Sequence, residues 1–573
     1  MNSAKPKILS LWIAIAGGLL FIPFLGGVHL FDWDEINFAE CAREMLITKE
    51  FGRVFINFEP FWEKPPLFIW LQALSMKVWG VNEFASRFPN AICGIFTLVV
   101  VFRIGRWLFD ERFGLLWALA FAGSLLPHFY FHSGIIDPWL NLFVFLGLHY
   151  FIRYFFIRSE VNYPLTNLRS PVLLLFISGM LIGLGMMTKG PVALLVFGLT
   201  IAVFWVWIKF RLFFTWFDVP LFLAASSIGA LLWVGYEYQH QGTWFIEQFL
   251  KYNIRLASTE DAGHGGFPGY HVVVLLFGCF PASLFFIHVH ISKPDSVLFR
   301  RLYLRLMLSL FWVVLIVFSL VQSKIVHYSS LCYFPITFGA AYSAYRIMNK
   351  DWLMPGWLRW SLLVIGLVIA ATVTVLPFLA QNTDLLKMLL AADPFAVANL
   401  DTVVRWTGIE WTVGLFVAGV ALVPFVWFGK GKTKQALYAL FGGTAVMAIL
   451  ILWAFIGRIE QFSQGTAIGY FKELANKDVY ILTYGYKSYA HYFYGNLQPE
   501  NKPQFYYPND LDRGSGEWMA KLLAGNNPKD VYVIAKITHA AELKERFPLV
   551  EKQQEGSGWV LFKRRKTVNL DYP

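Results

Sequence analysis

Long hydrophobic runs, separated by short polar segments, occupy most of this chain. About thirteen of these runs have roughly 18 to 25 residues, the length that an α-helix needs to cross a bilayer. They begin near Ile8, Phe84, Phe113, Ile136, Pro171, Pro191, Trp216, Tyr270, Leu302, Tyr328, Leu358, Gly408 and Ala436. The pattern therefore predicts a polytopic α-helical membrane protein.

The first hydrophobic run, from about Ile8 to Leu30, follows two lysines and could be a signal peptide. It is long enough to span and lacks an obvious small-residue cleavage site, so we expect a retained transmembrane helix. Lysine and arginine residues gather in alternate loops, which predicts a cytoplasmic N-terminus and an outside C-terminus. Two long loops, Phe31 to about Val81 and Gln239 to Gly269, fall on the outer side. We therefore expect the chemistry there.

From about Arg458 onward the hydropathy drops and the pattern becomes that of a small α/β domain. It contains three β-type runs, at Asp478–Thr483, Asp530–Ile537 and Gly558–Phe562. It also contains two helical patterns, at Lys487–Tyr494 and His539–Phe547. We predict a transmembrane domain over residues 1–457, with interfacial helices in its first outer loop (31–83). Residues 458–573 are predicted to form a domain on the outer side that caps the site or docks the acceptor.

Composition excludes a soluble globular protein. The chain has 573 residues, of which 57% are hydrophobic and only 15% charged, whereas soluble proteins carry about 25% charged residues. The net charge of +11 is scattered between apolar runs and forms no basic face for nucleic acid. The four cysteines show neither disulfide nor metal-type spacing, and no Rossmann or Walker glycine motif is present. The sequence thus predicts neither a metal nor a cofactor.

Three carboxylates lie at the predicted outer ends of helices. Asp34 and Glu35 follow the first span, and Asp137 stands at the entrance of the fourth. Asp34 and Asp137 could be helix N-caps, because aspartate accepts hydrogen bonds from first-turn N–H groups. The alternative is a general base at the membrane surface, since an acceptor hydroxyl must lose its proton as it attacks.

Several cationic and donor groups lie on the same predicted side. They are Lys64, Lys189, Arg255, Lys324, His327 and Tyr328. The apolar stretch from Leu67 to Trp79, directly after the first lysine, is too short to span and is expected to lie along the membrane surface. The lysine at 189 lies in a very short turn between two spans, where an ionisable group is a functional candidate in need of an anionic partner.

Each of these cations alone could be a snorkelling or boundary residue. Together they provide what a phosphate needs, because lysine and arginine both hold it and stabilise it as a leaving group. The inferred substrate is therefore a lipid that carries a phosphate-linked group. In the first loop, Glu40, Arg43 and Glu44 have the three- and four-residue spacing of intrahelical pairs, so we expect them to be structural.

An ordered series of motifs resembles the polyprenyl-phosphate-sugar-dependent GT-C glycosyltransferases. The likeness is to the bacterial branch typified by the lipid A aminoarabinose transferase and the related protein mannosyltransferases. The motifs are Asp34-Glu35 with Phe38-Ala39-Glu40 and Ala42-Arg43-Glu44-Met45, Glu63-Lys64-Pro65-Pro66-Leu67, Trp70, Gly80 to Pro89 with Arg87, Thr188-Lys189-Gly190-Pro191, and Lys324 to Tyr328 with Pro335. The resemblance covers roughly Phe31 to Pro335.

The resemblance implies an inverting transfer of a sugar from an undecaprenyl-phosphate-type lipid to a periplasmic acceptor. It implies that Asp34 is the catalytic aspartate and that Asp137 is a second acidic position. It also associates the donor phosphate with a set of residues, Lys64, Lys189, Arg255 and Tyr328. The chain has Phe38 where the motif commonly has tyrosine, and Ile325-Val326-His327 where aminoarabinose enzymes more often show Leu-Pro-Thr. The sugar and the acceptor therefore stay open.

Three hypotheses follow from the sequence. The leading one is a metal-independent glycosyltransferase of the bacterial inner membrane that acts on lipid A, lipopolysaccharide or another glycolipid. The second is protein O-mannosyltransferase-like transfer to Ser or Thr of secreted proteins. The third is a lipid-linked sugar flippase, for which buried charges within helices and internal repeats would be expected.

Overall fold

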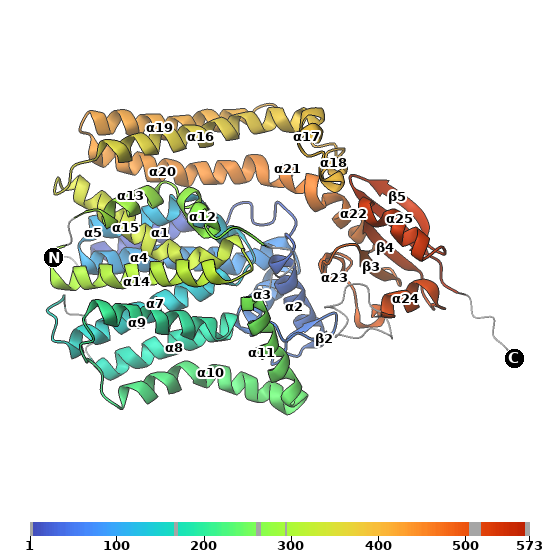
Figure 1. Ribbon diagram of the computed structural model, residues 1–573, viewed down its shortest axis with the longest axis horizontal. Helices are drawn as coiled ribbons and strands as arrows, with labels where there is room; N and C mark the ends of the chain where they lie inside the picture. The colour runs from blue at the N-terminus through green and yellow to red at the C-terminus, as the bar shows by residue number, and fades with distance from the viewer. Residues whose placement is uncertain (1–3, 165–169, 259–264, 293–294, 503–516, 568–573) are drawn as a thin grey trace.

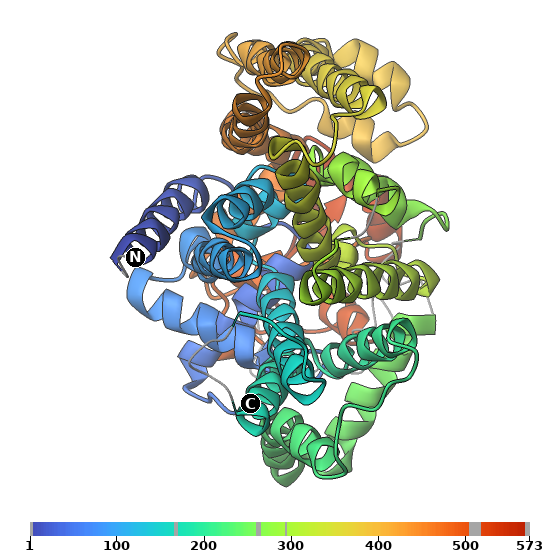
Figure 2. The same ribbon diagram turned by 90° about the vertical axis from the view of Figure 1, so that its left-hand side faces the viewer.

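The computed structural model describes residues 4–164, 170–258, 265–292, 295–502 and 517–567. Long helices lie with their axes roughly parallel, and a small sheet domain lies at one end of the bundle (Figure 1). Seen along the bundle, α16 (Gly356–Gln381) and α19 (Trp411–Gly429) form a group at one edge (Figure 2). The predicted fold class, a polytopic helical membrane protein with a small C-terminal α/β domain, is confirmed.

Within the described residues, eight helices are long and apolar enough to cross a membrane. They are α4 (Glu83–Leu108), α7 (Asp137–Arg158), α8 (Pro171–Lys189), α10 (Asp218–Gln241), α14 (Leu298–Leu320), α16, α19 and the helix Thr433–Leu474. Two bent pairs raise the number to ten if each pair is one span. One joins α5 (Glu111–Ala122) to α6 (Leu125–Phe129) and η1 (Tyr130–His132) at 81°, and the other joins α12 (Tyr270–Gly278) to α13 (Ala282–His290) at 114°.

The other three predicted runs fall on α1 (Ala4–Phe21), α9 (Val192–Trp207) and α15 (Tyr333–Met348). The helices α9 and α15 have 16 residues each, fewer than the about 20 that a span usually needs. All thirteen predicted runs thus coincide with helical segments, and eight to ten of them meet the length and composition of a span. Connecting helices are α11 (Thr243–Ser258), η2 (Val326–Cys332), α17 (Thr383–Leu389) and α18 (Pro394–Asn399).

Aromatic side chains fill the centre of the bundle. Phe145 of α7 stacks on Phe334 of α15 with ring centroids 4.2 Å apart, and Trp117 of α5 is fully buried beside them. The helices α4 and α5 pack closely because Gly114 faces α4, where an added Cβ would lie 2.4 Å from the Phe102 carbonyl oxygen. The packing fixes how the ends of these helices are placed relative to one another.

The first loop folds over one end of the bundle. It contains α2 (Asp34–Thr48), the hairpin β1 (Phe55–Ile56) and β2 (Glu59–Pro60), and α3 (Leu67–Trp79). The α3 helix has the bounds predicted for the interfacial helix. Arg43 and Glu40 form a buried ion pair at 2.7 Å, as their spacing predicts.

The C-terminal domain holds a four-stranded sheet in the order β3-β4-β6-β5. Its strands are β3 (Tyr480–Tyr484), β4 (Val531–Lys536), β5 (Glu551–Gly556) and β6 (Trp559–Arg564), and only the β3 and β4 pair is parallel. Its helices are α22 (Thr466–Leu474), α23 (Ala490–Tyr494), η5 (Pro499–Asn501), α24 (Glu517–Ala524) and α25 (Ile537–Arg546). The three predicted strands and the two predicted helices are found, whereas the sequence did not predict β5, α22, η5 or α24.

One continuous helix connects the bundle to this domain. It consists of α20 (Thr433–Ile451), the π-helical turn η3 (Leu452–Ile456), α21 (Gly457–Glu460), a second π-helical turn η4 (Gln461–Gly465) and α22. The predicted boundary between residues 457 and 458 falls inside this helix. The division into two domains stays a prediction.

The first loop and the C-terminal domain share one hydrophobic core. Ile36 and Ala39 of α2 belong to the same cluster of buried side chains as Phe471 of α22 and Ile534 of β4. Polar contacts join the two parts as well, since the hydroxyl of Tyr494 accepts a 2.7 Å hydrogen bond from the Leu30 N–H. The segment that enters the first loop is therefore held by the C-terminal domain.

Candidate active site

Four helix ends meet at the end of the bundle that faces the C-terminal domain. Asp34 lies in the first turn of α2, Asp137 opens α7, Lys189 closes α8, and His327 lies in η2. The glycine and proline that follow Lys189 end α8 and start α9, because Gly190 adopts a positive φ of 84°. The short turn keeps the lysine at the helix end.

These four side chains form a chain of close contacts. The His327 Nε2 lies 3.1 Å from the Asp34 Oδ2 and 3.7 Å from the Asp137 Oδ2. The Lys189 ammonium donates a 2.7 Å hydrogen bond to the Asp137 Oδ1 and lies 4.8 Å from the centre of the Tyr328 ring. The anionic partner that the sequence required for Lys189 is therefore Asp137, which is 2% exposed.

The N-cap explanation for the two aspartates is wrong. The N-cap positions of α2 and α7 are occupied by Trp33 and Ile136, and neither helix start has a side-chain cap hydrogen bond. Asp34 and Asp137 instead lie inside the first turns, where a carboxylate also benefits from the positive end of the helix dipole. Both side chains are thus available to the contacts with His327.

The environment of Asp34 keeps its carboxylate ionised. Burial by itself raises the pKa of this group, but the contact with His327 and the charges of Lys64 and Lys189 outweigh that effect and lower the pKa to about 2. The carboxylate is therefore charged throughout the neutral range and can act as a proton acceptor there.

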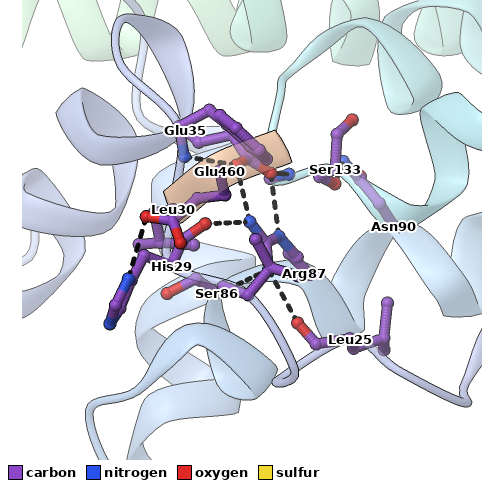
Figure 3. Close-up of polar contacts among 12 residues, drawn as sticks. Leu25, His29, Leu30, Glu35, Ser86, Arg87, Asn90, Ser133 and Glu460 are labelled. Atoms are coloured by element: carbon purple, nitrogen blue, oxygen red, sulfur yellow. Dashed lines mark hydrogen bonds and ion pairs between the residues drawn. The ribbon is translucent and has the colours of Figure 1, made fainter. Parts of the chain in front are cut away.

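Glu35, the other predicted catalytic carboxylate, forms an ion pair with Arg87 of α4 (Figure 3). The guanidinium Nε and Nη2 donate hydrogen bonds of 3.0 and 2.9 Å to the two carboxylate oxygens, and both side chains are nearly inaccessible. Glu35 also accepts hydrogen bonds from the backbone N–H groups of Phe31 and Gly134. Its carboxylate thus ties the start of α2 to the segment before α7.

Arg87 also donates to the backbone carbonyls of three residues after α1, namely Leu25, Val28 and His29. The ion pair therefore holds together the end of α1, the start of α2 and α4. The sequence pointed to Arg87 only through its place in a motif of the family that the chain resembles. A catalytic role for Glu35 stays a prediction.

Tyr252 of α11, which the sequence did not single out, organises two of the predicted phosphate ligands. The Lys64 ammonium donates a 2.8 Å hydrogen bond to the Tyr252 hydroxyl and lies 4.6 Å from its ring centre. The Arg255 guanidinium lies 5.6 Å from the same ring. Burial lowers the pKa of Lys64, which the carboxylates of Glu63 and Asp34 partly oppose. The structure therefore brings the two cations together around one aromatic side chain.

Lys324 occupies a different position from the other predicted cations. Its ammonium donates hydrogen bonds to the carbonyl oxygens of Ser319 and Val321, at the C-terminal end of α14. A cation at this place stabilises the negative end of the helix dipole. The side chain also lines the main cavity of the site.

A cavity of about 560 Å³ opens beside Asp34 and His327. Its wall is mostly apolar and is contributed by the first loop, η1, η2 and the helical turns around Ile456. A much smaller cavity of about 20 Å³ lies next to Asp137, Lys189 and Tyr328. Among the described residues, no group of three or more His, Cys, Asp or Glu side chains is arranged to hold a metal ion. The site offers proton acceptors and cations around an apolar space.

Comparisons with known proteins find a matching family model and several similar proteins. A family model described as dolichyl-phosphate-mannose-protein mannosyltransferase matches residues 63–233. The undecaprenyl phosphate-alpha-4-amino-4-deoxy-L-arabinose arabinosyl transferase of Photorhabdus laumondii is 24% identical over 287 residues, and that of Pectobacterium atrosepticum 26% over 285 residues. Each match covers 49% of this chain and 49% of the relative. The chain thus spans about half the length of the curated relatives that it matches.

Solved structures match over the whole chain. The crystal structure of ArnT from Cupriavidus metallidurans in the apo state has a TM-score of 0.72 at 15% sequence identity, and that bound to undecaprenyl phosphate has a TM-score of 0.69 at 14%. Both matches cover 100% of each chain. The GT-C fold suggested by the sequence motifs is confirmed.

Proposed function

We propose that this protein is an inverting glycosyltransferase that moves a sugar from a polyprenyl phosphate to an acceptor on the periplasmic side of the bacterial inner membrane. The observation that carries the proposal is the chain of contacts from Asp34 through His327 and Asp137 to Lys189, beside the 560 Å³ cavity. Relatives named as undecaprenyl phosphate-aminoarabinose transferases support the class of donor.

In the proposed reaction, the acceptor hydroxyl oxygen bonds to C1 of the sugar as the bond from C1 to the phosphate oxygen breaks. The bonding electron pair leaves with the polyprenyl phosphate, and the hydroxyl proton passes to Asp34. Because the pKa of Asp34 is about 2, the carboxylate is a weak base toward a free hydroxyl. It accepts the proton late, when bond formation has made the hydroxyl acidic, as suits an oxocarbenium-like transition state.

The proposed ligands of the donor phosphate are the cationic and donor groups around Asp34, namely Lys64, Lys189, Arg255, Lys324 and Tyr328. Charge-assisted hydrogen bonds from such groups hold a phosphate and stabilise the charge that it gains on leaving. A phosphate-linked carrier lipid brings its own leaving group, so the proposed reaction needs no nucleotide site.

The proposed acceptor is lipid A, lipopolysaccharide or another glycolipid. The largely apolar wall of the main cavity suits a lipid-anchored acceptor better than a free sugar. We also propose that residues 458–573 form a separate domain that guides the acceptor toward the first loop. Its Ser488 donates a hydrogen bond to Asp32, and its Tyr489 packs on Trp33 with ring centroids 5.2 Å apart. Both partners in the first loop line the main cavity.

The test is transfer of radiolabelled sugar from polyprenyl-phosphate donors by the purified protein in nanodiscs that contain glycolipid. Wild type is expected to label the lipid fraction, and Asp34→Asn is expected to lose at least about 100-fold in kcat, within the range for removal of a general base. The exposed Asp384 of α17 offers a matched control, Asp384→Asn, which is expected to keep full activity.

The other outcomes discriminate among the alternatives. Transfer by Asp34→Asn at the wild-type rate would refute the assigned role of this carboxylate. Label in Ser or Thr of added secreted protein, with none in lipid, would favour protein glycosylation. Movement of the donor across the bilayer without transfer to either fraction would favour a flippase.

A further inference from the structure

The imidazole of His327 stands between the two aspartates of the site. Its Nε2 lies within ion-pair distance of the Oδ2 atoms of Asp34 and Asp137, at 3.1 and 3.7 Å. Among the described residues, neither this nitrogen nor the Asp137 Oδ2 has an aligned hydrogen-bond partner. Because the other oxygen of Asp137 is taken by Lys189, its free oxygen faces the imidazole. The two carboxylates are thus linked through one side chain.

The backbone of His327 is also held against α7. The Ser330 hydroxyl donates a 2.5 Å hydrogen bond to the His327 carbonyl oxygen, and the Asn141 amide donates a 2.8 Å hydrogen bond to that hydroxyl. Asn141 lies one helical turn after Asp137, so η2 contacts α7 at two successive turns. A side chain whose backbone is fixed in this way can set the position of another group with little freedom.

We propose that His327 is a positioning residue that holds Asp34 in its reactive orientation. This inference rests on the proposed function and adds a residue to its machinery. The imidazole contacts one oxygen of Asp34, which leaves the other oxygen for the acceptor hydroxyl.

The titratable and charged groups near Asp34 lie on several elements. They are His327 of η2, Asp137 of α7, Lys189 of α8 and Lys64 before α3, together with five groups that line the same cavity, namely Asp32, Glu35, Arg87, His132 and Lys324. Removal of the imidazole leaves the two lysines but takes away the nearest contact, while the burial that raises the pKa of Asp34 is unchanged. The acid limb of the pH–rate profile should therefore move to higher pH in a variant without the imidazole.

Two substitutions separate positioning from bulk structure. His327→Ala removes the contact, and His327→Gln places an amide N–H near the position of Nε2 without an ionisable ring. With the labelled-donor assay, His327→Ala is expected to lower kcat by about 100-fold, the cost of a small misplacement of a reacting group, with the KM for donor within about twofold of wild type. His327→Gln is expected to recover most of kcat, and the acid limb of its profile should lie between those of the other two proteins.

The exposed His240 of α10 provides the control variant His240→Ala, which is expected to match wild type in kcat and in pH profile. A His327→Ala protein with wild-type kcat and an unmoved acid limb would overturn the inference. Equal losses in His327→Ala and His327→Gln, with the pH profile of wild type, would also overturn it, because they would indicate a packing role.

A second measurement does not depend on sugar transfer. Melting temperatures in detergent are compared for wild type, His327→Ala, Asp34→Asn and the double variant at pH 7. The loss caused by His327→Ala is expected to shrink strongly when Asp34 is already neutral, since contacting residues couple in such cycles. Additive losses would overturn the link. Strong coupling in a protein that transfers no sugar from any donor would refute the proposed function while leaving the link in place.

Discussion

Substitution of Arg87 tests whether its ion pair with Glu35 supports the site. The two side chains are 4% and 6% exposed, so solvent screens their interaction little. In Arg87→Ala, the Glu35 carboxylate stays buried with two backbone N–H donors but without its counter-charge. Removal of one partner from a buried pair costs about 3–5 kcal/mol. We expect a loss of this size in the free energy of unfolding.

Arg87→Ala also removes the hydrogen bonds to the carbonyl oxygens of Leu25, Val28 and His29. This change adds little to the loss of about 3–5 kcal/mol, because two of the three hydrogen bonds are only partly buried and their carbonyls can bind water instead. Arg87→Lys keeps the charge but loses the two-pronged contact, so its loss should be smaller. The double variant Glu35→Gln/Arg87→Met removes both charges and is expected to regain most of the stability, since replacement of a buried pair by uncharged groups is often close to neutral.

The assay is denaturation in mixed micelles, followed by tryptophan fluorescence, together with sugar transfer at a temperature where each variant is folded. Arg106→Ala, at an exposed position of the same helix, serves as the control. An Arg87→Ala variant as stable as the control would refute the reasoning. A double variant no more stable than Arg87→Ala would show that geometry rather than charge compensation dominates.

Three further outcomes follow from the contacts of the site and the first loop. Lys64→Met should raise the KM for donor by at least about tenfold, because a tenfold change corresponds to about 1.4 kcal/mol, the lower end of the contribution of a hydrogen bond to a charged group. Lys189→Met should lower kcat more than it raises KM. Equal kinetic constants in the two variants would contradict these different roles. Burial and the neighbouring carboxylate of the same helix, Glu40, raise the pKa of Glu44, so the charged form of Glu44 destabilises the fold at high pH. Glu44→Gln should therefore raise the melting temperature at pH 8. This gain should vanish as the pH falls to about 4.5. Tyr494→Phe leaves the buried N–H of Leu30 without its acceptor and should cost about 1–3 kcal/mol in unfolding free energy; an unchanged denaturation midpoint would refute it.

The hydrophobic pattern was enough for the helices because each span is defined by local sequence. It did not place the bend at Gly123, which depends on packing, because a Cβ at this position would lie 2.0 Å from the Phe441 carbonyl oxygen of α20. The strand β5 was missed because Glu551–Gly556 contains no apolar residue: it lies at the edge of the sheet and its side chains are largely exposed. A strand without a buried face has no period-two signal.

For the site, the sequence identified Asp34, Asp137 and Lys189 because charged groups at the ends of apolar spans are conspicuous. It could not pair them, since residues 34, 137, 189 and 327 belong to four separate elements and no local rule joins them. His327 was noted as a donor group, but its place between the two aspartates depends on how η2 packs against α7. Tyr252 carried no signal, because one tyrosine in an aromatic-rich chain resembles the many that anchor helices at membrane surfaces.

The contacts of the cations also rank them as proposed phosphate ligands. Lys189 is bound to a carboxylate at 2.7 Å and Lys324 to the carbonyls that end α14, whereas Lys64 is bound to the neutral hydroxyl of Tyr252. A hydrogen bond between two charged groups is roughly twice as strong as one between neutral groups. An arriving phosphate would therefore displace the tyrosine hydroxyl from Lys64 at lower cost than it would displace the carboxylate of Asp137 from Lys189. We therefore propose that Lys64 binds the donor phosphate first. Lys189 is proposed to compensate mainly the negative charge of the two aspartates.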